Sequence, residues 1–186
     1  MKSLNEKKVL LAECSQLKTE RLLLTPLSLL HLSDYHEYIS DDETLRFEFF
    51  PTKNIQESKG SLVNWNITSP LGRYALVLKK NYKMIGHISL TLNEERNSAF
   101  VGYSLNKRYW NKGYATEALK EIVSLSFNTL NLSELEADFI SENIGSQKVL
   151  EKNGFTVLNR IKQKTSLRGQ LVDYSNAKLF KEDIIN

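Results

Sequence analysis

The second half of the chain carries two distinct hydrophobic periods. Side chains of a strand alternate between two faces, whereas residues three and four apart share one face of a helix. Between residues 73 and 105, alternating positions predict consecutive strands at Arg73–Lys79, Met84–Leu92 and Ala99–Leu105. The turns between them are short and polar, which is typical of an antiparallel meander.

A helical period follows the meander. Its apolar stripe comprises Ala115, Ala118, Leu119, Ile122, Val123, Ser126 and Phe127. A strand at Leu135–Ile140 and a second helix at Asn143–Asn153 come next, and Gly154 suits the left-handed position after a helix end. Two closing strands, Thr156–Thr165 and Leu171–Phe180, are expected to form a hairpin.

The first third of the chain is less regular. A strand is expected at Arg21–Thr25, a short helix across Leu27–Ile39 and a weaker helix across Ile55–Ile67. The aromatic segment Phe47–Pro51 has no clear period. Taken together, the elements predict the α/β class, with a mixed central sheet.

Composition narrows the function classes. The 186 residues include 25 Lys and Arg against 22 Asp and Glu, which gives a formal net charge of +3. So small a surplus argues against a strongly cationic nucleic-acid binder and against a polybasic membrane arm. The length and the 41% hydrophobic content predict one domain over residues 1–186, with residues 1–18 as an N-terminal extension.

Cysteine and histidine content excludes further chemistries. Cys14 is the only cysteine, so neither an intrachain disulfide nor a CxxC metal site can form. The three histidines are scattered, and we expect no metal site. The apolar run Val9–Ala12 is too short for a signal-peptide core, and no stretch approaches the roughly 20 apolar residues of a membrane span. A cytoplasmic protein without a membrane partner is therefore expected.

The segment with the clearest chemistry runs from Leu105 to Ala118, where a strand ends and a helix begins. A helix N-terminus presents unpaired N–H groups and partial positive charge, which suits a phosphate. Gly113 and Ala115 allow a ligand to approach the backbone closely. The basic side chains that add positive charge to this segment are Lys107, Arg108 and Lys112.

Other interpretations of this segment fit less well. A dinucleotide fingerprint needs GxGxxG and a P-loop needs GxxxxGK[ST], and Gly113 alone meets neither pattern. Aromatic residues interleave with the basic ones, as on nucleic-acid surfaces, but the low net charge and the lack of a second such stretch argue against that partner. From the residues alone, a plain strand-to-helix turn with core aromatics stays open.

The spacing Leu105-x4-Trp110-x2-Gly113-x-Ala115 resembles the acyl-CoA pyrophosphate loop of the GNAT acetyltransferases, hydrophobic-x4-[Q/R]-x2-G-x-[G/A]. Trp110 replaces the usual Gln or Arg, as it often does in the branch containing ribosomal-protein N-terminal acetyltransferases. The further segments that resemble this branch are Thr19–Leu24, Gly102–Leu105 and Asn143–Phe155. Together the motifs follow one another along residues 19–180.

The resemblance implies a GNAT fold, in which acetyl-CoA lies in a V-shaped gap between two splayed parallel strands, with helices on both faces of the sheet. Backbone groups of Ser104 and Leu105 would pair with the pantetheine arm, and the N–H near Leu105 would stabilise the oxyanion. Asn143 would contact the cofactor as well as cap its helix. The loop residues implied in cofactor binding are Trp110, Asn111, Lys112, Gly113, Tyr114, Ala115 and Thr116.

The transfer needs a base that deprotonates the amine and an acid that protonates the leaving thiolate. Many family members carry the acid, a Tyr, at a position that is Leu150 here. Ser146 becomes the candidate acid, and its alternative role is a local cap in the first turn of its helix. The Glu that often serves as base is replaced by Phe100.

The candidates left for the base are Glu48, Glu142 and His87. Glu48 lies in the aromatic segment that would face the substrate, where it would act as the base or recognise a cationic amine. His87 is expected to share a strand face with Ile85, Ser89 and Thr91, which favours a structural role. A chain of water molecules is an alternative to all of them.

These residues predict an N-acetyltransferase that acts on a primary amine, foremost the α-amine of a protein or peptide. A small amine such as an aminoglycoside or polyamine is the alternative acceptor, and an acyl-CoA-binding protein without turnover is the alternative function. A peptide acceptor predicts a groove around Phe47–Pro51 and the turn at 166–170, whereas a small amine predicts a closed acidic pocket. Either a monomer or a homodimer is compatible with the sequence.

Overall fold

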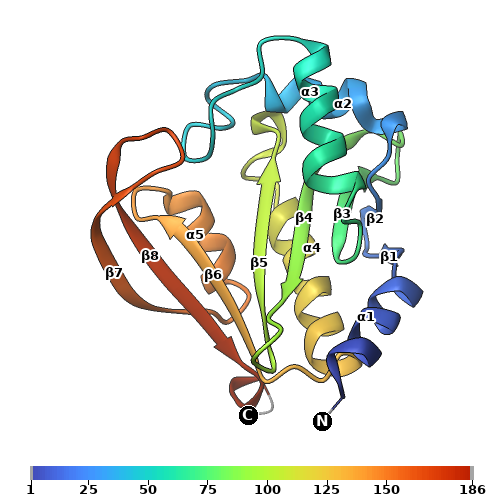
Figure 1. Ribbon diagram of the computed structural model, residues 1–186, viewed down its shortest axis with the longest axis vertical. Coiled ribbons are helices and arrows are strands. Elements are labelled where there is room, and N and C mark those ends of the chain that lie inside the picture. Colours follow the sequence, from blue (N-terminus) through green and yellow to red (C-terminus); the bar gives the residue numbers. More distant parts are fainter. Residues whose placement is uncertain (1, 185–186) are drawn as a thin grey trace.

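The computed structural model describes residues 2–184, and its strands form one mixed sheet in the order β1-β2-β3-β4-β5-β6-β8-β7 (Figure 1). The strands are β1 (Leu17–Lys18), β2 (Leu22–Pro26), β3 (Arg73–Leu78), β4 (Met84–Leu92), β5 (Ser98–Leu105), β6 (Glu134–Ile140), β7 (Thr156–Thr165) and β8 (Leu171–Phe180). The α-helices are α1 (Leu4–Glu13), α2 (Leu32–Ile39), α3 (Ile55–Leu62), α4 (Tyr114–Ser124) and α5 (Ile144–Glu151). Two of them, α3 and α4, continue as π-helical turns over Val63–Ile67 and Leu125–Thr129.

The meander and the splayed pair are both confirmed. Strands β2, β3, β4 and β5 pair antiparallel in sequence order. Strand β6 runs parallel to β5 but pairs with it only where Ser98, Ala99 and Phe100 face Glu134, Leu135 and Glu136. Beyond that point β6 stays paired with β8 while β5 stays paired with β4, so the two halves of the sheet diverge. We call this opening the β5–β6 gap.

Alternation along the strands divides the core between the two faces of the sheet. On the α4–α5 face, residues such as Leu76, Val101 and Leu119 belong to the larger cluster of buried apolar side chains. On the α2–α3 face, a smaller cluster includes Tyr38 and Val77. Burial of each such side chain contributes about 1.5–3 kcal/mol. The prediction of helices on both faces is therefore confirmed.

A close approach between β4 and β5 explains why position 86 is a glycine. A Cβ atom at Gly86 would lie 2.3 Å from the carbonyl oxygen of Ser104, so no other residue fits there without a shift of the backbone. The register between β3 and β4 also shifts at this level, between Leu76 and Val77. Both features lie beside the strand that borders the β5–β6 gap.

The N-terminal segment is the main departure from the predicted elements. The sequence assigned no helix or strand to residues 1–18, yet the structure has α1 and β1 there. Within α1 only Lys7 and Leu11 are buried, so the helix has no apolar stripe that a period could reveal. The helix expected across Leu27–Ile39 is also shorter, because Leu29–His31 forms a separate 3₁₀ turn before α2.

Candidate active site

The connection between β5 and α4 presents backbone N–H groups to a ligand. Gly113 is the N-cap of α4 and adopts φ 80°, and Asn111 has φ 58°. Since glycine has no side chain, nothing from the N-cap residue covers the helix end. The first recorded bond of the helix runs from the Glu117 N–H to the Gly113 carbonyl, at 2.9 Å. Tyr114, Ala115 and Thr116 thus direct N–H groups without intrahelical partners outward, and such an end fits a phosphate.

Arg21, the residue immediately before β2, fixes this helix end. Its Nε lies 2.6 Å from Glu117 Oε2, and its Nη1 donates to the carbonyl of Lys112 at 2.9 Å. The guanidinium also lies over the Tyr114 ring, 4.3 Å from the centroid. Burial opposes the ionisation of Glu117, but hydrogen bonds from Thr19 and Arg21 outweigh it and hold the pKa of Glu117 below its usual value. The Thr-Glu-Arg segment at residues 19–21 therefore stabilises the start of α4.

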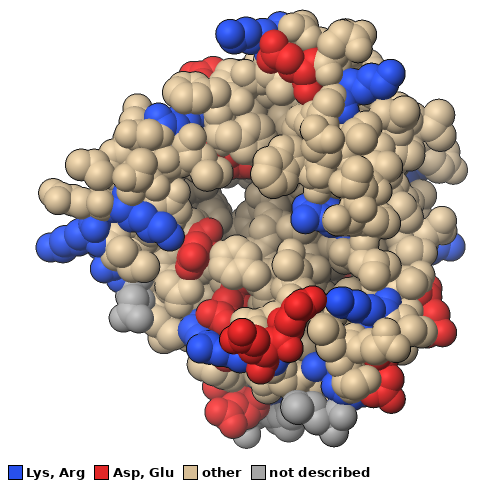
Figure 2. Space-filling model, viewed as in Figure 1, with Lys and Arg blue, Asp and Glu red and all other residues tan. Residues whose placement is uncertain are grey.

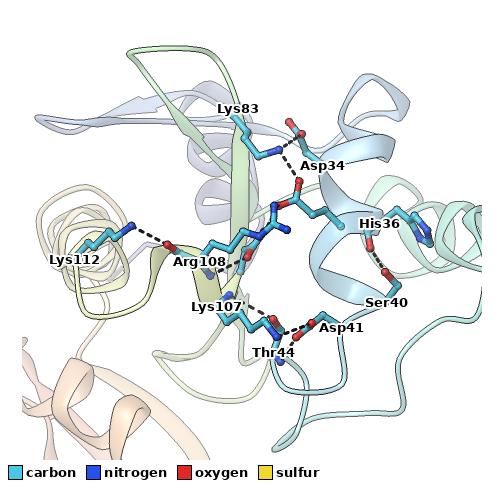
Figure 3. Close-up of polar contacts among 11 residues, drawn as sticks. Asp34, His36, Ser40, Asp41, Thr44, Lys83, Lys107, Arg108 and Lys112 are labelled. Carbon is cyan, nitrogen blue, oxygen red and sulfur yellow. Dashed lines mark hydrogen bonds and ion pairs between the residues drawn. The ribbon is translucent and has the colours of Figure 1, made fainter.

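The basic side chains near this loop are mostly turned away from it (Figure 3). Lys107 Nζ lies 2.9 Å from Asp41 and 2.8 Å from Glu43, and Arg108 pairs with Glu37 at 3.0 Å. The expectation that Lys107 and Arg108 add positive charge for a phosphate is therefore wrong, because carboxylates in and just after α2 neutralise them. Lys112 Nζ instead donates to a backbone carbonyl, that of Arg108, at 2.8 Å. Its charge has no recorded carboxylate partner within residues 2–184.

The register of β5 decides which backbone groups face the β5–β6 gap. His87 pairs with Ser104, and the Asn106 N–H donates to the Ile85 carbonyl at 2.9 Å. Because hydrogen-bonded pairs alternate along an antiparallel ladder, the backbone of Ser104 is directed towards β4. The backbone groups of Tyr103 and Leu105 are directed towards the gap instead. The expected pair, Ser104 and Leu105, is thus replaced by Tyr103 and Leu105.

Trp110 connects the end of β5 to the loop. Its indole Nε1 donates to the carbonyl of Leu105 at 2.6 Å, and its ring packs against the larger core cluster. The Leu105 carbonyl is therefore occupied, while the N–H of the same residue still faces the gap. This contact also holds the loop against the strand.

Ser146 and Tyr103 meet on the α4–α5 face. Asn143 is the N-cap of α5, and its Oδ1 accepts from the Ser146 N–H at 3.1 Å. Ser146 Oγ lies 2.9 Å from the Tyr103 hydroxyl, so the serine side chain bonds across to β5. Burial raises the pKa of Tyr103 to about 12, which keeps its proton in place at neutral pH. Leu150, at the position where many family members have the acid Tyr, is a buried core residue.

Tyr103 is not among the site residues predicted from the sequence, although its hydroxyl bonds to Ser146. Alternation places it opposite Ile88 on the α4–α5 face, on the strand that borders the gap. That placement was readable from the predicted strand, but its meeting with Ser146 was not, because the two residues belong to separate elements.

Glu48 lies on the other face of the sheet. Its Oε1 accepts from Ser104 Oγ at 2.9 Å, and adjacent strand residues such as Tyr103 and Ser104 point to opposite faces. Burial raises the pKa of Glu48 to about 7, and the Ser104 hydrogen bond and the charge of Arg168 moderate the rise. A carboxyl that titrates near neutral pH is suited to general-base chemistry. Ser146 and Glu48 therefore approach the gap from opposite faces.

The other two candidates for the base are placed differently. His87 Nδ1 lies 2.8 Å from the Tyr38 hydroxyl, and burial, with a smaller contribution from Arg73, lowers the pKa of His87 to about 4. So low a pKa makes a weak proton acceptor. Glu142 lines a cavity of about 390 Å³ next to the gap. The residues that line this cavity are Arg46, Phe47, Ile140, Glu142, Gln170 and Val172.

The tip of the β7–β8 hairpin holds the segment that carries Glu48. Arg168 is 11% exposed, and its Nη1 lies 2.8 Å from Asp42. Its Nη2 donates to the carbonyls of Leu45 and Phe49 at 2.8 and 3.1 Å. Figure 2 shows the surface hollowed between β5 and the strands β6 and β8, close to these segments. No local sequence pattern indicated this contact, because it joins segments far apart in the chain.

The splayed sheet and the uncapped start of α4 are the features that the sequence resemblance implied for an acyl-CoA-binding protein. The chain belongs to the GNAT acetyltransferase family, because the family model described as "Acetyltransferase (GNAT) domain" matches residues 21–156. It is an acetyl-CoA-dependent N-acetyltransferase. The uncharacterized N-acetyltransferase p20 of Bacillus licheniformis is 27% identical over 172 residues, which cover 90% of this chain and 97% of that protein.

Solved structures show the same fold at low sequence identity. The ribosomal-protein-S5-alanine acetyltransferase from Vibrio fischeri has a TM-score of 0.76 and 20% identity, and the match covers 90% of this chain and 97% of that one. A spermidine N-acetyltransferase from Vibrio cholerae, in complex with CoA and spermine, has a TM-score of 0.74 and 19% identity, with 89% and 99% covered. The expectation of a GNAT fold is confirmed.

Metal clusters and membrane-spanning helices are both absent from the described part of the chain. Over residues 2–184, no cluster of three or more His, Cys, Asp and Glu side chains is arranged to hold a metal ion. No helix in that range has the length and apolar character needed to cross a bilayer.

Proposed function

We propose that this acetyltransferase acts on the α-amine of a peptide or protein, with Glu48 as general base and Ser146 as general acid. The observation that carries this proposal is the position of the two groups on opposite faces of the sheet at the β5–β6 gap. Their nearest partners are Ser104 and Tyr103, which are neighbours on β5. A donor and an acceptor that enter the gap from opposite faces would meet between these groups.

The residues proposed to hold acetyl-CoA are on the α4–α5 face. The N–H groups at the start of α4 would bind the pyrophosphate, and Asn111, Lys112 and Gly113 would shape that loop. The backbone of Tyr103 would pair with the pantetheine arm, the N–H of Leu105 would face the thioester carbonyl, and Asn143 would border the arm. The site fits the cofactor, because these N–H groups are directed outward and β6 diverges from β5 beside them. When bound, acetyl-CoA supplies a thioester carbonyl and a thiolate leaving group.

Proton movements are assigned to side chains of this chain. The acceptor attacks as the neutral amine, and the Glu48 carboxylate takes the proton that the nitrogen loses as the amide forms; with a pKa of about 7, Glu48 is largely deprotonated just above neutral pH. That proton then passes to solvent, from which Ser146 regains the one it donates. The Leu105 N–H donates to the oxygen on which negative charge develops. Ser146 Oγ gives its proton to the departing sulfur, and the Tyr103 hydroxyl, 2.9 Å away, orients that serine.

The acceptor side supports an extended substrate. The cavity lined by Phe47 and Gln170 lies where a peptide groove was expected, between the aromatic segment and the turn at 166–170. Its charged lining is one Arg and one Glu, Arg46 and Glu142, rather than a set of carboxylates suited to a polyamine. A relative of the same fold is a ribosomal-protein-S5-alanine acetyltransferase. We further propose that the chain acts as one domain, in the cytoplasm.

An acceptor panel tests this function. Purified protein would be incubated with acetyl-CoA and either a short peptide with a free N-terminus, the same peptide with a blocked N-terminus, spermidine or an aminoglycoside, while free thiol is followed. We expect thiol release with the free peptide and none above background with the blocked one. Preference for spermidine or the aminoglycoside would overturn the peptide assignment. Acetyl-CoA binding without transfer to any amine would contradict the catalytic roles.

A further inference from the structure

A buried tyrosine determines which nitrogen of His87 carries the proton. Tyr38 on α2 is fully buried, and its hydroxyl lies 2.8 Å from His87 Nδ1, its one recorded hydrogen-bond partner within residues 2–184. A buried hydroxyl that fails to donate its proton costs about 1–3 kcal/mol. Tyr38 therefore donates to Nδ1. Burial also raises the pKa of Tyr38 far above its usual value, so the proton stays on the hydroxyl.

It follows that His87 is neutral and protonated on Nε2. A neutral imidazole has one donor and one acceptor nitrogen, and the hydrogen bond at one nitrogen fixes the role of the other. This tautomer is assigned from the hydrogen-bond arrangement. The low pKa of His87, about 4, agrees with a neutral ring. Nε2 is thus an N–H donor.

The Nε2–H lies on the same face as Glu48. His87 and Ser104 are directly opposite each other on β4 and β5, and side chains paired in this way share a face with their Cβ atoms about 5 Å apart. Ser104 in turn holds Glu48 through its hydroxyl, at 2.9 Å. The His87 side chain is only partly buried although it lies deep in the sheet.

We propose that His87 is an acceptor-binding residue, whose Nε2–H donates to the carbonyl oxygen next to the α-amine and so selects α-aminoacyl acceptors over simple amines. The proposal rests on the function proposed above and specifies its acceptor. In an α-aminoacyl group the amine and the carbonyl oxygen are close neighbours, and Glu48 and His87 are related in a similar way, because Ser104 bonds to Glu48 and pairs with His87 across β4 and β5. A polyamine has a methylene group where the carbonyl would be, so it leaves the N–H unpaired. Sites built around such a hydrogen bond reject analogues that lack it.

A pair of acceptors and a pair of variants test this role. L-Alaninamide carries the carbonyl, whereas isopropylamine is a comparable amine without it. We expect His87→Leu to lower kcat/KM for alaninamide by about 10- to 100-fold, as for loss of about 1.4–2.7 kcal/mol of transition-state binding, and to change isopropylamine less than about threefold. His87→Gln keeps an N–H donor at a similar reach, and it should recover part of the alaninamide activity.

The controls separate this role from folding and from the proposed function. His87→Leu leaves the Tyr38 hydroxyl unpaired, so Tyr38→Phe/His87→Leu is measured as well, with thermal unfolding and acetyl-CoA calorimetry for each variant. The double variant should show the same selective loss. Equal losses for both acceptors, or no loss, would overturn the role of His87 while the proposed function stands. Failure of the wild-type protein to acetylate any α-amine would overturn the proposed function itself.

Discussion

The two faces of the sheet build their halves of the site differently. On the α4–α5 face, the groups proposed to bind phosphate are neighbours in sequence, within residues 105–116, and most of them are backbone N–H groups. On the α2–α3 face, Glu48, His87 and Ser104 come from separate segments, and Arg168 from the last hairpin fixes the first of them. One half depends on backbone conformation and the other on individual side chains.

This difference predicts different responses to substitution. A backbone-built site loses affinity when a side chain forces the loop into another conformation, whereas most side-chain changes there are tolerated. A side-chain-built site loses a defined step when one functional group is removed. The variants below separate the two halves, and each is paired with a control of matching chemistry.

Removal of the base should have the largest effect. Glu48→Gln keeps the shape and the hydrogen bond with Ser104 but cannot accept the proton that the attacking amine loses. We expect kcat/KM to fall by about 10²- to 10³-fold at pH 7.5, with acetyl-CoA affinity unchanged by calorimetry. Glu43→Gln is the control, since Glu43 precedes the same aromatic segment but faces Lys107. A Glu48→Gln enzyme as active as that control would remove Glu48 from the mechanism.

Removal of the acid should have a smaller effect, because a thiolate leaves without full protonation. Ser146→Ala is expected to lower kcat by about 10- to 50-fold with little change in KM for acetyl-CoA. Tyr103→Phe, which leaves the serine but removes its partner, should fall between the wild type and Ser146→Ala. Steady-state kinetics on both variants checks this. Ser124→Ala, at an exposed position of α4, is the control, and an equal loss in all three variants would point to a general structural cause.

A change at Gly113 probes the backbone-built half. Gly113→Ala places a Cβ at φ 80°, 3.3 Å from Arg21 Nη2, so the loop must adjust. We expect acetyl-CoA to bind about 10-fold more weakly by calorimetry, which corresponds to about 1.4 kcal/mol. Gly169→Ala has a similar φ, 75°, with no atom within 4 Å, and lies at the other half of the site. If both variants bind acetyl-CoA as tightly as the wild type, the loop does not hold the cofactor.

The smallest effect is expected at the hairpin tip. Arg168→Gln removes the bond to Asp42 and a positive charge that lowers the pKa of Glu48. The base would be protonated to a higher pH, so the pH profile of kcat/KM should move upward and activity at pH 7 should fall a few-fold. Arg160→Gln, which loses an exposed ion pair with Asp173 on the same hairpin, should leave the profile in place. Identical profiles for the two variants would contradict the electrostatic role of Arg168.

The features that could be predicted from the sequence are mostly in the backbone-built half of the site. The phosphate loop was predictable because strand, glycine and helix start lie in one contiguous segment, and the splayed strands followed from the family resemblance. The choice between Tyr103 and Ser104 was not, since it depends on the register between β4 and β5. Local pattern also could not show that carboxylates after α2 neutralise Lys107, because residues far apart in the chain meet there. The helix α1 was not predicted for another reason, because it has no apolar stripe.

The hydrogen-bond partners of His87 and Arg168 also could not be predicted from local sequence patterns. Strand alternation correctly grouped His87 with one face, but its bond to Tyr38 joins β4 to α2. Arg168 lies between the two predicted closing strands, but no local pattern showed that its side chain reaches back to Asp42 and two carbonyls. Long-range polar contacts of this kind depend on the final packing. The hydrophobic periods of strands and helices, 2 and 3.6 residues, carry no information about that packing.

The most direct test of the account is the ratio of kcat/KM for the wild type to that for Glu48→Gln, measured from pH 5.5 to 9 with one peptide acceptor. Titration of the acceptor amine affects both enzymes and cancels in the ratio. Glu48 acts only when deprotonated, and burial places its pKa at about 7. The ratio should therefore rise with pH through about 7 and then level off. A ratio that is flat across this range would contradict Glu48 as the general base.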